Sequence, residues 1–209
     1  MTDFDKCVMG GFNPPNKLMV DTDGAQEDPS TVYLNEAKME QLDLMQGDTI
    51  ILVGRRKHKC IAIAQPKEEV SEGSIFVGAQ IRKNLRVRVT DSIRILPAED
   101  CPVLTRIEIK PYKDTIEGLT GDLSTTFLVP YFHEAYRPVH RGNTFRISAN
   151  FRDIDFKITE TEPGEFGTVG PNTEIFHEGF YFYCFLRSFG VFFSIVIQRF
   201  VFLRNFLIK

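Results

Sequence analysis

The chain lacks the loop with which many ATPases hold phosphate. That loop reads G-x-x-x-x-G-K-[ST], and the dipeptide Gly-Lys occurs nowhere in the 209 residues. Gly164, Gly167 and Gly170 are spaced like a glycine-rich loop, but Pro163 and Pro171 flank them and no helical pattern follows, which favours a hairpin turn. We therefore expect neither ATP binding nor a nucleotide cofactor in this sequence.

Signatures of other enzymes and of metal sites are missing too. The nucleophile motif G-x-S-x-G is absent. The four histidines, His58, His133, His140 and His177, are scattered and lack the His-x-x-x-His spacing of a helical metal site. Acidic residues fall mostly on the polar side of alternating strands, where exposure to solvent explains them. The sequence predicts a protein that is not an enzyme and that binds no metal.

No C-x-x-C pair occurs, because Cys7, Cys60, Cys101 and Cys184 lie 53, 41 and 83 residues apart. This spacing favours a reduced compartment over a secreted disulfide scaffold. Residues 1–11 contain no apolar run of the kind that a signal peptide needs. The expected location is the cytoplasm, with the nucleus as a further option.

The last thirty residues contain four basic residues and no acidic ones. The rest of the chain holds 21 basic and 28 acidic residues, which gives it a net charge of −7. Such a charge repels phosphate backbones, so we expect no nucleic-acid partner. One basic run stands out at residues 55–59, Arg-Arg-Lys-His-Lys. It is either a solvated hairpin tip or a patch for nuclear import or an acidic partner, and the residues leave both open.

The first half of the chain shows strand patterns rich in β-branched residues. Strands are expected at residues 18–20, 31–34, 48–54, 60–64, 86–89 and 92–95. Short helices are expected at residues 36–44, with Asn35 as N-cap, and at 81–85. Gly47-Asp48 and Thr90-Asp91, 43 residues apart, each place a tight turn with an acceptor carboxylate before an apolar strand. This predicts an imperfect duplication of a strand–helix–strand unit.

A linker is expected where Pro97, Asp100 and Pro102 interrupt the pattern. Beyond it, isoleucines at 107 and 109 and apolar residues at 154, 156 and 158 alternate with charged ones, as in half-buried antiparallel strands. This pattern predicts a second small β-barrel or sandwich.

Residues 130–138, Pro-Tyr-Phe-His-Glu-Ala-Tyr-Arg-Pro, combine aromatic rings with a guanidinium. These residue types dominate interface hot spots. Tyr131, Phe132 and Tyr136 are therefore candidate interface residues.

Several long motifs appear together and in one order, at residues 84–91 (Asn-Leu-Arg-Val-Arg-Val-Thr-Asp), 116–123 (Ile-Glu-Gly-Leu-Thr-Gly-Asp-Leu), 130–138, and 156–163 (Phe-Lys-Ile-Thr-Glu-Thr-Glu-Pro). They closely resemble the N-terminal domain of the valosin-containing protein family, the hexameric AAA ATPase segregases of eukaryotes. The resemblance covers about residues 16–179.

The resemblance implies a mainly β fold with short helices, in which a double-psi β-barrel is followed by a smaller β-barrel subdomain. The implied organisation is a flexible arm at residues 1–15, the first barrel at 16–97, a linker at 98–104 and the second barrel at 105–179. Residues 180–209 form an apolar tail unlike the family.

In that family the domain is not catalytic, and it recruits adaptors for ubiquitin-dependent protein quality control and endoplasmic-reticulum-associated degradation. Ubiquitin-like domains or arginine-rich helical motifs of adaptors dock between the two subdomains, and ubiquitin itself is a further partner to consider. ATP binding and hexamer formation would belong to ATPase modules outside this sequence. The alternative is an independent two-barrel cofactor subunit that binds ubiquitin directly. A decarboxylase built on the same barrel lacks candidate catalytic residues here.

The resemblance assigns partner-binding residues by position, namely Asp28, Met45, Gly47, Asp48, Ile63, Val103, Ala135, Tyr136 and Arg137. Asp28 would offer a carboxylate to an adaptor arginine, Ile63 an apolar floor, and Tyr136 a ring on the opposite wall. Met45 stands where the family usually has Phe, and Val103 where it usually has Tyr. These two differences imply weaker binding or a choice of different adaptors.

The resemblance also assigns Arg86, Arg88 and Arg152 to the junction with the first ATPase module. Ser148 replaces another arginine of that junction, which puts regulation through it in doubt.

After residue 179 the family continues through an acidic linker, whereas this chain holds nine Phe in its last thirty residues and no Pro, Ala or Thr there. Translated T-rich DNA gives such a composition, so read-through of an intron or a frameshift is our first explanation. A membrane anchor is the alternative, because residues 179–197 span 19 residues with the single charge of Arg187. Membrane association is not the favoured interpretation.

Overall fold

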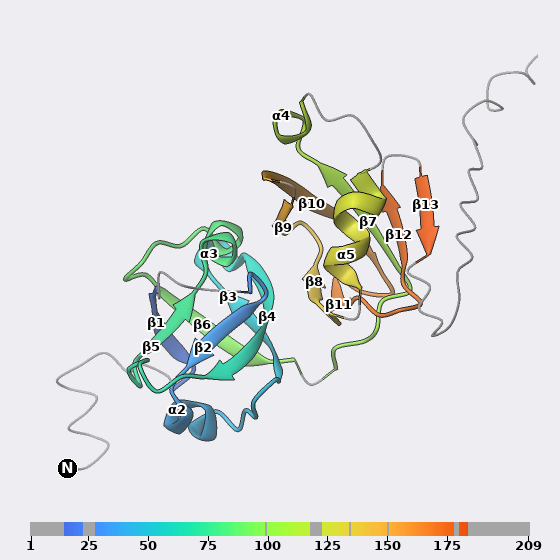
Figure 1. Cartoon of the computed structure of the whole chain (residues 1–209). Coiled ribbons are helices and arrows are strands. Elements are labelled where there is room, and N and C mark those ends of the chain that lie inside the picture. Colours follow the sequence, from blue (N-terminus) through green and yellow to red (C-terminus); the bar gives the residue numbers. More distant parts are fainter. Residues whose placement is uncertain are drawn as a thin grey trace, which may run out of the picture.

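The structure is a computed structural model that describes residues 15–22, 28–98, 100–117, 123–133, 135–149, 151–177 and the backbone of 180–183. The flexible arm and the end of the tail, predicted above, lie outside these residues. The described part forms two β subdomains that lie next to each other, the first built from β1 to β6 and the second from β7 to β13 (Figure 1).

The first subdomain is a closed barrel of six strands in the order β1-β5-β2-β4-β3-β6. Its strands are β1 (Lys17–Asp21), β2 (Thr31–Leu34), β3 (Thr49–Val53), β4 (Lys59–Pro66), β5 (Ser74–Val77) and β6 (Ser92–Pro97). β1 pairs with β5 and β2 with β4 in parallel, and the other pairings are antiparallel. Closure leaves no free sheet edge, and the enclosed core includes Leu18, Val32, Ile50, Leu52 and Ile75.

The barrel is built from two copies of one unit. Exchanging β1, β2 and β3 with β4, β5 and β6 leaves the set of strand pairings and their directions unchanged. The starts of β2 and β5 lie 43 residues apart, and so do those of the two barrel helices and of β3 and β6. This extends the duplication that the sequence predicts to the whole barrel.

The turn before the last strand of each unit has the same hydrogen bonds. The N–H of Met45 donates to Asp48 Oδ2 at 2.8 Å, and the N–H of Arg88 donates to Asp91 Oδ2 at 2.8 Å. Gly47 and Thr90 both have positive φ, 91° and 75°. The predicted acceptor carboxylates before these strands are therefore confirmed.

Both barrel helices are short, α2 (Glu36–Gln41) and α3 (Ala79–Leu85). Asn35 caps α2 as predicted, because its side chain accepts the N–H of Ala37 at 3.0 Å. The prediction that this helix continues to residue 44 is wrong, since the chain leaves the helical conformation and Asp43 adopts φ 56°.

The predicted strand at residues 86–89 is wrong. Arg86 ends α3 in the left-handed conformation with φ 55°, and a turn follows. The alternation arises because Val87 packs into the core under this turn while Arg86 and Arg88 stay exposed. The hairpin between β3 and β4 has the expected basic tip, a short 3₁₀ turn labelled η1 (Arg55–Lys57).

The second subdomain contains a five-stranded sheet in the order β13-β12-β7-β10-β9 and a two-stranded sheet of β8 and β11. The bounds are β7 (Arg106–Pro111), β8 (Pro138–His140), β9 (Thr144–Ala149), β10 (Arg152–Glu162), β11 (Phe166–Thr168), β12 (Glu174–His177) and β13 (Phe180–Tyr183). The apolar residues that alternate along β7 and β10 are buried as predicted. The mainly β fold class with a barrel and a second β subdomain is confirmed.

Two features of this subdomain differ from the expectation. Residues 180–183, placed in the tail by the sequence, form β13 and pair with β12. Besides the short α4 (Lys113–Ile116), a helical segment made of η2 (Ser124–Leu128) and α5 (Val129–Phe132) packs Phe127, Leu128 and Phe132 into the core. The sequence pattern does not predict this helix, because β-branched residues and Pro130 have low helix propensity. Proline is nevertheless tolerated in the first turn of α5.

None of the helices in the described residues is long and apolar enough to cross a membrane. The segment 179–197, which is the alternative membrane anchor, lies outside the described side chains.

We predict that Asp48→Ala and Asp91→Ala each lower the free energy of unfolding by about 1 kcal/mol, because each removes one hydrogen bond from a backbone N–H. Urea unfolding followed by circular dichroism measures both losses. They should agree within about 0.5 kcal/mol, since the two turns have the same geometry. A loss at only one of the two aspartates would show that the turns do not stabilise the barrel equally.

Candidate functional site

The residues that the resemblance assigns to the partner-binding cleft come from both subdomains, and Arg137 connects them. One guanidinium nitrogen of Arg137, Nη1, lies 2.6 Å from Asp28 Oδ1 and 3.2 Å from Ser30 Oγ. The carbonyl of Ser30 accepts the N–H of Ile63 at 2.9 Å. Asp28 and Ile63 of the barrel are thus neighbours of Arg137, although 109 residues separate Asp28 from Arg137.

Val103, in the linker between the subdomains, also lies close to Arg137 through contacts with residues 168–170. Val103 forms a β-bridge with Thr168, and the carbonyl of Arg137 accepts the N–H of Val169 at 3.0 Å. Gly170 leaves room for Val103, because a Cβ at Gly170 would lie 2.7 Å from Val103 Cγ1. Val103 therefore lies next to the end of β11, where the following residue, Val169, contacts Arg137.

The α2 turn joins the region from the barrel side. The N–H of Gly47 donates to the carbonyl of Ala64 at 2.9 Å, and the N–H of Ala64 donates to that of Asp48 at 2.8 Å. Ala64 follows Ile63 directly, so Gly47 and Asp48 lie beside the Ile63 segment of β4. Contacts thus run from the α2 turn through Ile63 and Asp28 to Arg137 and on to Val103.

Three of these residues expose large apolar side chains. Met45 is 74%, Val103 57% and Tyr136 56% exposed, and they make up three of the seven exposed large hydrophobic residues in the described part of the chain. Isolated exposed apolar residues need no explanation, whereas a contiguous exposed apolar patch marks an interaction site. These three residues lie on segments that the contacts above connect.

Tyr136 has a backbone conformation that is rare for an aromatic residue, with φ 43°. The next residue is held firmly: Arg137 Nε donates to the carbonyl of Tyr131 at 2.9 Å, and its guanidinium carbon lies 4.3 Å from the centre of the Tyr131 ring. These contacts fix the segment that exposes Tyr136. Ala135 beside it is half-buried.

The candidate interface role of Phe132 and Tyr131 needs correction. Phe132 is buried in the core. Tyr131 stacks on Phe145 with ring centres 5.0 Å apart, and burial raises the pKa of its hydroxyl. Of the three aromatic residues singled out in this segment, only Tyr136 presents its ring to solvent, because the helix η2–α5 turns the other two toward the sheet.

Asp28 does not stand free in this structure. Its Oδ1 accepts the N–H of Ser30 at 2.9 Å in addition to the Arg137 guanidinium. An adaptor arginine at this position must share the carboxylate with Arg137 or displace it. Sequence reasoning from the barrel alone missed this pair, because its partner lies in the other subdomain.

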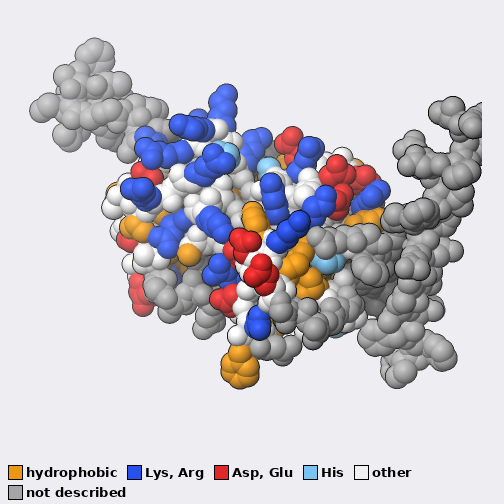
Figure 2. All heavy atoms as spheres, turned by 90° about the horizontal axis from the view of Figure 1, so that it is seen from above, with side chains coloured by type: hydrophobic (Ala, Val, Ile, Leu, Met, Phe, Trp, Pro, Cys, Tyr) orange, Lys and Arg blue, Asp and Glu red, His pale blue; other side chains and the backbone are white. Residues whose placement is uncertain are grey.

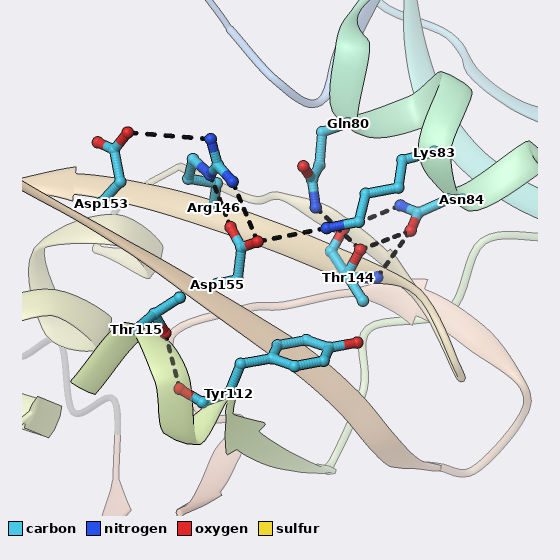
Figure 3. A network of polar contacts seen from close by, with 9 residues as sticks. All are labelled: Gln80, Lys83, Asn84, Tyr112, Thr115, Thr144, Arg146, Asp153 and Asp155. Carbon is cyan, nitrogen blue, oxygen red and sulfur yellow. Dashed lines mark hydrogen bonds and ion pairs between the residues drawn. The ribbon is translucent and has the colours of Figure 1, made fainter. Parts of the chain in front are cut away.

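A second set of contacts fixes the two subdomains on the α3 side (Figure 3). Helix α3 places Gln80, Lys83 and Asn84 on one face, as the spacing i, i+3 and i+4 requires. The Asn84 amide donates to the carbonyl of Thr144 at 2.8 Å and accepts its N–H at 2.9 Å. Asn84 thus acts on the edge of β9 as a paired strand would, and Gln80 adds a 2.8 Å hydrogen bond to Thr144 Oγ1.

Asp155 of β10 completes this seam. Its carboxylate lies 2.6 Å from Arg146 Nε and 3.3 Å from Lys83 Nζ, and the residue is buried. The hydrogen bond from Arg146, helped by Lys83, holds the pKa of Asp155 below its ordinary value. The general expectation that acidic residues on strands are solvated is wrong for Asp155, because the side chains of Arg146 and of Lys83 from α3 bind its carboxylate.

The arginines assigned to the ATPase junction lie on both subdomains and are exposed. Arg86 and Arg88 belong to the turn after α3, whereas Arg152 starts β10 and donates to the carbonyl of Glu117 at 3.3 Å. Ser148 donates to Asp153 Oδ1 at 2.6 Å. The contacts found among the described residues do not join Arg152 to the other two, and their common role stays a prediction.

The seam between the subdomains has little room for a small molecule. A cavity of about 40 Å³ lies there, lined among others by Cys60, Asn84, Arg137 and His140, whereas ligand pockets measure several hundred Å³. Burial raises the pKa of the Cys60 thiol to about 12, so this thiol is not a nucleophile at neutral pH. No cluster of three or more metal-ligating side chains occurs among the residues that the structure describes.

We predict that Asp155→Asn lowers the free energy of unfolding by about 2 kcal/mol at neutral pH, the upper range for hydrogen bonds to charged groups. The pKa of Asp155 is lower in the folded state, so its contribution is present above the ordinary value of 3.8 and is lost as the pH falls through the lower folded value. Denaturation curves from neutral pH to about pH 3 should show the difference from wild type shrinking only below about pH 4.

Asp153→Asn is the matched control, because this neighbouring carboxylate is 58% exposed and 3.9 Å from Arg146. It should change stability by less than about 0.5 kcal/mol. Equal losses in the two variants would contradict the structural role of Asp155.

A comparison with known protein families gives a match over the residues that form the barrel. Residues 18–100 match the model of a family described as "Cell division protein 48 (CDC48), N-terminal domain". The match extends from β1 through β6 and so covers both copies of the duplicated unit. Together with the closed barrel and the second β subdomain, it supports a CDC48-type N-terminal domain, the adaptor-binding domain of a AAA ATPase family.

Proposed function

We propose that this chain recruits adaptor proteins for a ubiquitin-dependent AAA ATPase segregase in protein quality control, including endoplasmic-reticulum-associated degradation. The observation that carries the proposal is the continuous set of contacts from the α2 turn through Ile63 and Asp28 to Arg137 and Val103. It brings residues from the barrel, the linker and the second subdomain to the place where the two subdomains meet. The family match over residues 18–100 supports the same function.

The chemistry of this surface favours an adaptor with an apolar anchor and a cation. Met45, Val103 and Tyr136 offer exposed apolar area, and the half-buried Ile63 lies between the barrel segments that bear Asp28 and Asp48. The second carboxylate oxygen of Asp28 and the Asp48 side chain can face a basic group. A ubiquitin-like domain or an arginine-rich helix inserted between the subdomains provides both features, in the loop-in-groove or helix-in-groove mode.

The proposed role is binding and not catalysis. The chain would hold adaptors, while ATP hydrolysis and hexamer formation would belong to the ATPase modules of the segregase. The domain itself then needs no cofactor. The proposed location is the cytoplasm, with the nucleus as a second compartment, because the cysteine spacing favours a reduced compartment.

We predict that Tyr136→Ala weakens the binding of a ubiquitin-like adaptor domain by about 2 kcal/mol, or about thirtyfold. The reason is that the exposed ring is the largest apolar group on this surface. Calorimetry with the purified chain measures the affinity.

The control is Arg56→Ala in the hairpin tip, which lies outside the proposed cleft and should leave the affinity unchanged. A loss only at Arg56 would move the adaptor site to the hairpin. Titration with free ubiquitin in parallel separates the alternative, since ubiquitin binding stronger than adaptor binding would favour a ubiquitin-binding cofactor subunit.

A double-mutant cycle tests the ion pair in the cleft. Asp28→Ala and Arg137→Ala should each weaken adaptor binding, and the double variant should lose about 1 kcal/mol less than the sum, because each side chain holds the other in place. The 2.6 Å distance between them predicts this coupling. Strictly additive losses would contradict this coupling.

A further inference from the structure

The two ends of the barrel have the same architecture but opposite charge. The α2 end, residues 36–48, carries four acidic side chains and one lysine, whereas the equivalent α3 end, residues 79–91, carries four basic side chains and one aspartate. Glu40 and Asp43 correspond to Lys83 and Arg86 at the 43-residue offset, and Asp43 and Arg86 have the same left-handed φ, 56° and 55°. The duplicated fold therefore presents one acidic and one basic end.

The hairpin tip η1 adds three more cations beside the α3 end. Gly54, which precedes the tip, packs against the end of α3, since a Cβ there would lie 2.5 Å from the carbonyl oxygen of Leu85. Arg55 Nη1 lies 4.0 Å from Asp91 Oδ2, and Arg55, Arg56 and Lys57 are all exposed. In the view onto this end of the barrel, Lys and Arg side chains gather over the surface (Figure 2).

An open hollow next to the tip is basic as well. Its lining includes Lys17 of β1 and Arg94 of β6, together with Val53, Gly54, Ser92 and Ile93, and contains no acidic residue. Lys17 and Arg94 are direct partners across the two antiparallel strands. Like charges in this arrangement repel each other, so an anion bound here would relieve that repulsion.

The tip cations are largely unneutralised. Among the ion pairs formed within the described residues, only Arg55 of this group has an acidic neighbour, and Lys17, Arg56, Lys57 and Arg94 have none. Arg56 and Lys57 also adopt positive φ, 52° and 62°, a conformation that glycine or asparagine would adopt with less strain. The local backbone conformation therefore does not explain why two large basic residues occupy these positions.

We propose that Lys17, Arg55, Arg56, Lys57 and Arg94, here named the cationic tip, bind an acidic peptide segment, a run of Asp and Glu in a partner protein. The cations lie on a protruding hairpin and beside an open hollow, which suits an extended chain carrying several carboxylates. Nucleic acid fits less well, because single strands bind on aromatic stacking platforms and the cationic tip contains no aromatic residue.

This surface differs from the proposed adaptor cleft. Met45, Gly47 and Asp48 belong to the turn at the α2 end, whereas the cationic tip packs against the turn at the α3 end. A partner that supplies an acidic segment would therefore leave the adaptor cleft accessible. The chain would then bind two proteins through the opposite ends of one duplicated barrel.

The test is a titration of a fluorescein-labelled Asp/Glu peptide with the full chain at about 50 mM and about 200 mM salt. We expect binding that weakens with salt, and a loss of about tenfold in Arg56→Gln/Lys57→Gln, as for two exposed ion pairs near the top of their range. Lys113→Gln/Lys157→Gln is the matched control: it removes the same charge from exposed positions elsewhere and should change the affinity less than about twofold.

Three results would overturn the proposal. Equal losses in the two double variants would show diffuse attraction without a site. Absence of peptide binding at the lower salt concentration would exclude an acidic partner. Tighter binding of an oligonucleotide with the same number of charges, lost in the tip variant, would assign the surface to nucleic acid. A ubiquitin-like domain should bind the tip variant as tightly as it binds wild type. This measurement distinguishes a failure of the acidic-peptide proposal from a failure of the proposed adaptor cleft.

Discussion

Arg137 reaches across the boundary between the two subdomains, and the shape of the proposed cleft depends on this contact. Its guanidinium binds Asp28 of the barrel, while its Nε and its charge hold Tyr131 of its own subdomain. On the α3 side, Asn84 and Lys83 attach the barrel to β9 and β10. With contacts on both sides of the boundary, the subdomains are held in one arrangement. The exposed residues Met45, Val103 and Tyr136 are then available to a partner without a large rearrangement, which lowers the entropy cost of binding.

Duplication explains how one small barrel can offer two different surfaces. The backbone of each turn is held by the same aspartate hydrogen bond, so the exposed side chains around it can change without loss of the fold. One copy carries acidic and apolar side chains, and the other carries basic ones. The acidic copy belongs to the adaptor cleft that we propose, and the basic copy lies beside the cationic tip. The α3 copy also supplies Lys83 and Asn84 to the seam, which ties its sequence to the orientation of the second subdomain.

Local sequence patterns predicted the structure correctly where the hydrophobicity of each residue agrees with its burial in the fold. Apolar segments rich in β-branched residues located five of the six barrel strands but missed β5, Asn35 marked the start of α2, and the two turn aspartates indicated the duplication. The patterns failed where tertiary contacts decide the structure. Arg-Val-Arg-Val reads as a strand, yet Val87 is buried by a turn, and residues 124–132 are helical although they include β-branched residues and Pro130. Asp155 looks solvated in the sequence, because its contacts with Arg146 and Lys83 form only in the folded chain. The Asp28–Arg137 pair spans 109 residues and leaves no local signal, so only family resemblance pointed to both residues.

The most direct test of the adaptor cleft is to map it by NMR. The ¹⁵N-labelled chain is titrated with an unlabelled ubiquitin-like adaptor domain, and the amide shifts of the free and bound states are compared. Our account predicts that the largest changes occur at Met45, Gly47, Ile63, Val103 and Tyr136, in one group that spans both subdomains. Changes confined to one subdomain, or centred on the hairpin at Arg55–Lys57, would contradict the claim that adaptors bind where the two subdomains meet.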